Sequence, residues 1–97
     1  MIENIKELFN SYEEHEFIHF GKIVNPPSKR PDICAFLLLD KLIPGDEDII
    51  EGAAHDVIFL NVNLEDLAKV ATEEDIIYLS RCGVFASSEY DGLCMFV

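Results

Sequence analysis

The chain has 97 residues, of which 49% are hydrophobic and 27% are charged, a composition typical of one globular domain. Nineteen Asp and Glu against seven Lys and Arg give a formal net charge of -12, and a surface of this sign repels the phosphates of nucleic acids. This composition excludes disordered and collagen-like chains and argues against direct nucleic-acid binding.

The predicted compartment is the cytoplasm. The first twenty residues contain five Glu and lack the basic start and apolar centre of a signal peptide. The longest apolar run, residues 33–39, is shorter than the roughly twenty residues that a membrane span requires, so no membrane partner is expected. The three cysteines, Cys34, Cys82 and Cys94, lie far apart in apolar surroundings, which predicts reduced core thiols.

The N-terminal half is predicted to mix one clear helix with less regular segments. Apolar residues spaced three and four apart predict an amphipathic helix from residue 2 to about residue 14. Aromatic and β-branched residues predict a strand at residues 17–24, and three prolines predict a loop at residues 25–32. The apolar run at residues 33–42 predicts a central strand buried on both faces, and a short helix is expected within residues 46–54 after a Pro-Gly turn.

The C-terminal half has stronger local signals. The run VIFLNV at residues 57–62 predicts a strand. A pair of helices is predicted at residues 64–71 and 73–82, with Asn63 and Thr72 as their N-caps. The Asp three residues after the Thr gives the second helix the spacing of a capping box.

The end of the chain is predicted to form a β-hairpin. Gly83 is expected to end the second helix, and strands are expected at residues 84–87 and 93–97, joined through Asp91-Gly92. Residues 1–97 are therefore predicted to form one α+β domain. Its expected architecture is a mainly antiparallel sheet of about four or five strands, an N-terminal amphipathic helix, a helical pair and a C-terminal β-hairpin.

One short motif suggests metal chemistry. The residues from His15 to His19 spell HExxH and resemble the zincin metallopeptidases over those five residues. On a helix, both imidazoles would lie on one face and Glu16 could activate a zinc-bound water. The predicted strand would instead hold the two histidines roughly 13 Å apart, too far to share one ion. We therefore expect no catalytic residue and no metal or other cofactor, with a zinc peptidase as an alternative.

The helical pair has the spacing of a helix-turn-helix unit. A DNA-binding unit of this kind places the first turn of its second helix in the major groove. In this chain that turn is Glu73-Glu74-Asp75, which repels phosphate. We therefore expect a structural helix pair that does not bind DNA.

The acidic residues are clustered more densely than helix capping requires. Like charges closer than the Debye length of roughly 8 Å destabilise a fold, so the excess serves either solubility or a basic partner. We predict contacts with a basic protein through charge-assisted hydrogen bonds to Arg and Lys. The predicted contact residues are Asp46, Glu47, Asp48, Glu51, Glu65, Asp66, Glu73, Glu74 and Asp75.

These features together predict a small acidic binding protein that inhibits a basic, nucleic-acid-acting partner, and they resemble immunity proteins and antitoxins in type. Such an inhibitor needs one charged patch with an aromatic anchor, for which Tyr12, Tyr78 and Tyr90 are candidates. The alternatives are a double-stranded DNA mimic of the kind phages use against defence nucleases, the HExxH peptidase, and a self-associating structural subunit. A homodimer is compatible with the inhibitor and with the mimic.

Overall fold

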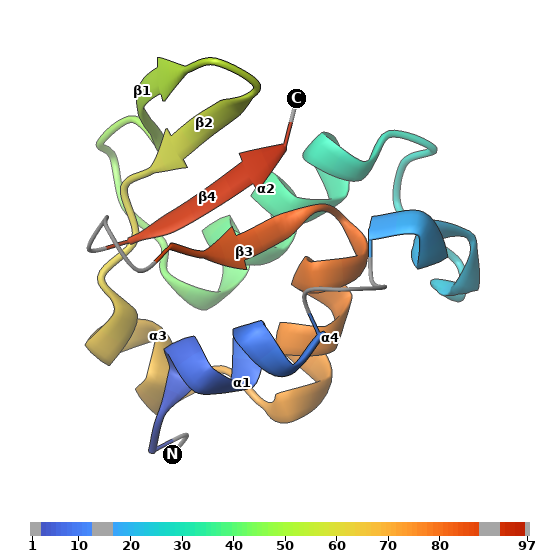
Figure 1. The fold of residues 1–97 in the computed structure, drawn as a ribbon, viewed down its shortest axis with the longest axis horizontal. Helices are drawn as coiled ribbons and strands as arrows, with labels where there is room; N and C mark the ends of the chain where they lie inside the picture. Colours follow the sequence, from blue (N-terminus) through green and yellow to red (C-terminus); the bar gives the residue numbers. More distant parts are fainter. Residues whose placement is uncertain (1–2, 13–16, 88–91, 97) are drawn as a thin grey trace.

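The structure is a computed structural model that describes residues 3–12, 17–87 and 92–96 (Figure 1). Helices precede and follow a first β-hairpin, and a second hairpin ends the chain. The elements are α1 (Ile5–Tyr12), the 3-10 helix η1 (Phe17–Lys22), α2 (Pro31–Leu42), β1 (Ile50–Ala54), β2 (Val57–Leu60), α3 (Leu64–Val70), α4 (Glu73–Arg81), β3 (Val84–Ala86) and β4 (Leu93–Phe96).

The four strands form one antiparallel sheet in the order β1-β2-β4-β3. A two-residue turn joins β1 to β2, and His55 adopts the left-handed backbone conformation there, with φ 56°. Helix α2 lies behind the sheet in Figure 1, while α1, α3 and α4 lie below it. The α+β class, the helical pair and the C-terminal hairpin are therefore confirmed.

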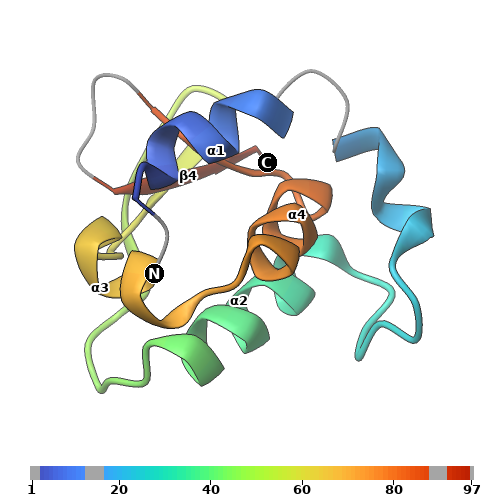
Figure 2. The ribbon, with the colours of Figure 1, turned by 90° about the horizontal axis from the view of Figure 1, so that it is seen from below.

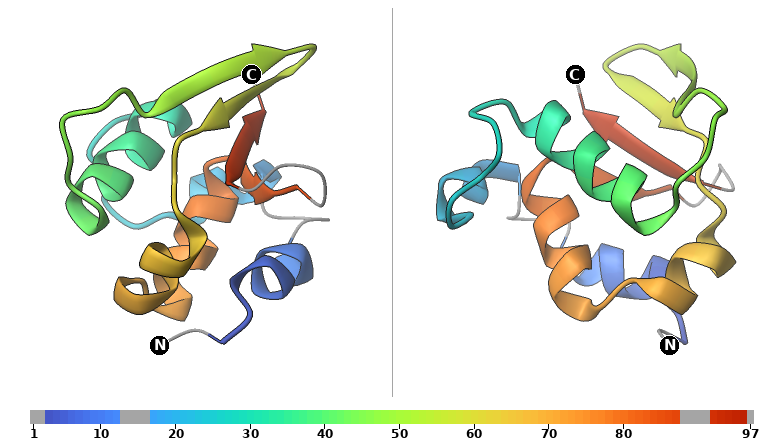
Figure 3. Two further views of the ribbon diagram at one scale, coloured as in Figure 1. Left: turned by 90° about the vertical axis from the view of Figure 1, so that its left-hand side faces the viewer. Right: turned by 180° about the vertical axis from the view of Figure 1, so that it is seen from behind.

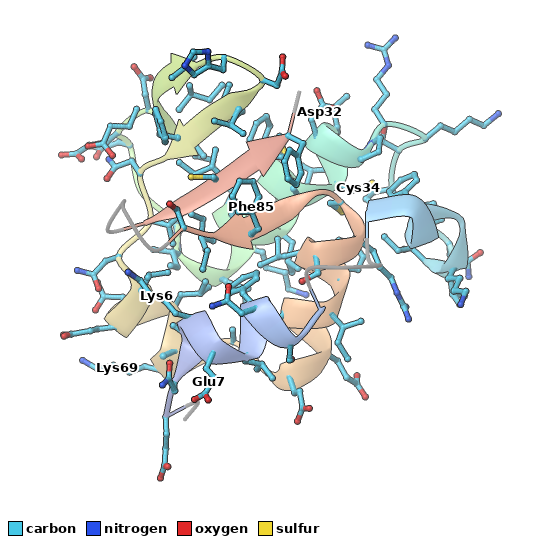
Figure 4. All side chains as sticks on the ribbon, viewed as in Figure 1. Lys6, Glu7, Asp32, Cys34, Lys69 and Phe85 are labelled. Carbon is cyan, nitrogen blue, oxygen red and sulfur yellow. The ribbon has the colours of Figure 1, made fainter. Side chains whose placement is uncertain are left out.

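The two faces of the sheet have different surroundings. Leu60 and Leu93 are paired across β2 and β4 and are fully buried in the core that the helices complete. The opposite face carries Phe85 and Phe96, whose rings stack with centroids 4.5 Å apart. Figure 4 shows Phe85 on the face turned away from α2. The core thus lies between the sheet and the helices.

The predicted helix caps are confirmed. The Asn63 side chain accepts a hydrogen bond from the backbone N–H of Asp66 at 3.0 Å. The Thr72 hydroxyl accepts one from the N–H of Asp75 at 3.2 Å, and the Asp75 carboxylate accepts one from the N–H of Thr72 at 2.9 Å, which completes a capping box. Gly83 follows the end of α4 with φ 93°, the left-handed conformation that ends many helices.

The predicted central strand at residues 33–42 is wrong, because this segment is helix α2. Pro31 stands in the first turn, where the missing N–H of proline costs no hydrogen bond. The run after Ile33 consists mostly of Ala, Phe and Leu, and Ala and Leu in particular are good helix formers. Apolar side chains on every side of this helix hide the periodicity that identifies a helix, and so they imitate a strand buried on both faces.

Two other predictions for the N-terminal half are also wrong. The predicted strand at residues 17–24 contains the 3-10 helix η1, and the N–H of Ile23 donates to the carbonyl of Phe20 at 3.0 Å. The predicted helix within residues 46–54 is a bent loop followed by β1. The pairing of β1 with β2 outweighs the weak strand preference of Gly52 and the alanines beside it.

The capping box gives a direct test of the helical pair. Thr72→Ala removes the acceptor for the N–H of Asp75, so we expect the free energy of unfolding to fall by about 1 kcal/mol. Thr72→Ser keeps a hydroxyl and is expected to retain most of the stability. Urea denaturation of the three proteins measures both changes, and equal losses in the two variants would contradict the capping role.

Candidate functional site

The first acidic cluster lies on the loop between α2 and β1. This loop borders a hollow of about 360 Å³. Two hydrogen bonds from Asn61 hold it, one from the backbone N–H to the carbonyl of Ile49 at 2.6 Å and one from Nδ2 to Glu47 Oε2 at 3.3 Å. The hollow is lined by Asp40, Ile43, Pro44, Gly45, Asp46, Glu47, Asp48, Ile49, Asn61 and Asn63.

The second acidic cluster follows the hollow along the chain. Asn63 lines the hollow and also caps α3, so Glu65 and Asp66 in the first turn of that helix follow it immediately. Two residues separate α3 from α4, whose first turn carries Glu73 and Glu74. Figure 3 shows the loop and α3 as neighbours, with the first turn of α4 next to α3. We call this surface, from Asp40 and the loop to the first turns of α3 and α4, the acidic face.

The predicted contact residues do not all have the same role. Asp46, Asp48, Glu65, Asp66 and Glu74 are exposed on the acidic face. Glu47 is exposed as well, and its carboxylate accepts the hydrogen bond from the side-chain amide of Asn61. These carboxylates are placed where a cation on a partner could reach them.

Asp75 and Glu51 fit the acidic face less well. Asp75 is half-buried, and its carboxylate already accepts the hydrogen bond from the N–H of Thr72. Glu51 is exposed on the edge strand β1, outside the lining of the hollow. Replacing Asp75 would therefore disturb the helix cap as well as the surface charge.

Sequence reasoning missed Asp40, Asn61 and Asn63 as members of the site. Asp40 comes from the last turns of α2, and the asparagines come from the end of β2 and the start of α3. Once residues 31–42 are read as a helix, Asp40 falls at the end nearest the acidic loop. The two asparagines give no comparable signal, because only the folding of β2 against β1 brings them to the loop.

The zinc alternative falls mostly outside the described residues. His15 and Glu16 are not among them, and His19 belongs to η1 by its backbone. Within residues 3–12, 17–87 and 92–96, no group of three or more His, Cys, Asp and Glu is arranged to hold a metal ion. The HExxH motif therefore stays an untested alternative.

Of the three candidate aromatic anchors, Tyr78 is the one whose side chain the structure describes. It is half-buried and lines a groove of about 250 Å³ together with Pro27, Cys34, Leu37, Leu38 and Lys41. Burial raises the pKa of Tyr78 to about 12, with a further contribution from its hydrogen bond with Cys34. Because this groove and the acidic hollow share no lining residue, Tyr78 is not the anchor of the acidic face.

The three cysteines are free and buried, as predicted. Cys34 lies in helix α2, however, and not in a strand. Burial raises the pKa of Cys82 to about 12 and also raises the pKa of Cys94. Their surroundings therefore favour inert thiols.

Comparisons with known proteins found no matching family model, curated protein or solved structure. A search for helices that are long and apolar enough to cross a membrane found none among the described residues.

Thiol reactivity tests the buried cysteines. With a pKa near 12 instead of the usual 9.0, Cys82 has a thiolate fraction at pH 8 lower by roughly a factor of 1,000. We expect the native protein to react with Ellman's reagent far more slowly than the urea-unfolded protein, in which all three thiols react. Rapid modification of three thiols in the native protein would contradict this burial.

Proposed function

We propose that this chain is a small acidic binding protein that inhibits a basic protein acting on nucleic acid, and that it binds this partner through the acidic face. The observation that carries the proposal is the hollow bordered by Asp40 and the loop carboxylates. An Arg or Lys side chain that enters it would meet carboxylate and amide oxygens from three elements. Charge-assisted hydrogen bonds of this kind are roughly twice as strong as neutral ones.

The charge distribution supports a basic partner. With a net charge of -12, the chain attracts positively charged surfaces over distances up to about the Debye length and repels acidic ones. Proteins that act on nucleic acid carry such positive surfaces, because they must hold phosphates. Electrostatic steering would then raise the rate of association as well as the specificity.

The hollow favours the inhibitor over the DNA mimic. A mimic needs carboxylates in an extended double row that stands in for two phosphate backbones. A concave site lined by both carboxylates and the asparagines Asn61 and Asn63 instead suits the insertion of single cationic side chains. We therefore propose the inhibitor, and the capture experiment described below distinguishes it from the mimic.

Neutralising the loop carboxylates tests the acidic face. We expect Asp46→Asn/Asp48→Asn to weaken partner binding at least tenfold, because two charged acceptors of the hollow are lost. The matched control is Glu7→Gln/Asp56→Asn, which removes the same charge from exposed positions on α1 and the β1–β2 turn. The control is expected to change binding less than twofold.

The partner is captured on the immobilised chain from a lysate of the encoding organism, eluted by a salt gradient and identified by mass spectrometry. Binding constants are then measured with the purified partner, together with its activity on nucleic acid. Equal binding by the two double variants would overturn the acidic face, and unchanged partner activity would overturn the inhibitor. Capture of many unrelated DNA-binding proteins would favour the mimic.

A further inference from the structure

Helix α2 leaves part of its apolar surface exposed. Its sequence, PDICAFLLLDKL, places apolar residues all round the helix, a pattern typical of a helix that is buried on every side. Cys34, Ala35 and Leu39 are buried against the rest of the chain. Ile33 and Leu37, one helical turn apart, are nevertheless 38% and 51% exposed. Figures 2 and 3 show α2 at the outside of the molecule.

A shallow groove lies beside this exposed stripe. Its volume of about 250 Å³ falls below the roughly 300–1,000 Å³ typical of small-molecule pockets. Its walls are mostly aliphatic, with contributions from Pro27, Leu37 and Leu38, and Lys41 and Tyr78 add polar groups. A groove of this size and lining suits an aliphatic side chain from another protein surface.

The two ends of α2 carry opposite charges. Lys29 and Arg30 are exposed just before the helix begins, whereas Asp40 and the Asp46–Asp48 segment are exposed at and beyond its end. Residues 17–42 contain four of the seven Lys and Arg but two of the nineteen acidic residues. The segments that flank α2 thus carry opposite charges, while Asp32 in its first turn and Lys41 in its last turn have the reverse signs.

We propose that α2 pairs antiparallel with the α2 helix of a second copy of this chain, across a two-fold axis near Leu37. Each Leu37 then lies against the groove of the other copy, and each basic end faces an acidic end. The result is a closed dimer with the same contacts made twice.

The charges favour a second copy over other occupants. A uniformly basic partner would be repelled at Lys29 and Arg30, and a uniformly acidic partner would be repelled at Asp46 and Asp48. The α2 helix of a second copy, running in the opposite direction, places an opposite charge at both ends and also covers Ile33 and Leu37. Because α2 is about 18 Å long, the interface is small, and we expect a dissociation constant in the micromolar range.

Sedimentation equilibrium between about 1 and 500 μM tests the dimer. The mass is expected to rise with concentration from 11.0 kDa to about twice that value and no further. Leu37→Lys should raise the dissociation constant at least tenfold. The control is Val70→Lys on α3, because Val70 is also 51% exposed, and its dissociation constant is expected to stay within twofold of wild type. Circular dichroism confirms that each variant is folded.

Charge reversal tests the antiparallel direction with substitutions at exposed loop and cap positions. Lys29→Glu/Arg30→Glu and Asp46→Lys/Asp48→Lys should each weaken the dimer, and an equal mixture of the two variants should restore association. In a parallel pair the two basic ends would lie together and the two acidic ends would lie together. Neither charge reversal would then disrupt an attractive contact.

Four results would overturn the proposal: a monomer at every concentration, a mass that rises beyond the dimer, equal behaviour of the Leu37 and Val70 variants, or a mixture that does not associate. The dimer does not rest on the proposed inhibitor function. Leu37→Lys weakens the dimer without changing a carboxylate of the acidic face, so we expect this variant to capture the partner at least as well as wild type.

Discussion

The burial of α4 is the constraint on which the rest of the structure depends. Ile76 and Leu79 are fully buried, and the helix contacts η1, α1, α2 and β3. No other described helix touches so many elements closely, so the position of α4 sets where the N-terminal helices and the C-terminal hairpin can lie. The Thr72–Asp75 capping box fixes the residue at which this helix begins. The fold therefore uses Asp75 of this acidic first turn, whereas Glu73 and Glu74 are exposed.

The parts of the fold that follow from the sequence are those with short-range signals. Asn63, Thr72 and Gly83 each act within four residues along the chain, and each ends or begins a helix where the sequence predicts it. The strand at residues 57–60 and the C-terminal hairpin have similarly clear β composition. Local chemistry decides these elements, so one sequence is enough to place them.

The elements that sequence reasoning missed depend on contacts between distant segments. Helix α2 gives no periodic pattern because Ile33 and Leu37 are apolar on its exposed side. The segment after the acidic loop becomes β1 because β2 pairs with it, although Gly52 and Ala53 have little strand preference. The clusters of carboxylates were visible in the sequence, but the hollow joins the end of α2 and the loop after it to Asn61 and Asn63, between β2 and α3, and exists only in the folded chain.

The two proposed surfaces share the loop between α2 and β1. In the dimer, Asp46 and Asp48 face the basic end of the second copy, and in the inhibitor they face a cation of the partner. One carboxylate cannot serve both at full strength, so the two binding events oppose each other. Thermodynamic linkage makes this opposition reciprocal: a partner that weakens the dimer by some factor is itself bound more weakly by the dimer, by the same factor. The dimer formed through the exposed stripe on α2 would then occupy Asp46 and Asp48 until a more strongly basic surface competes for them.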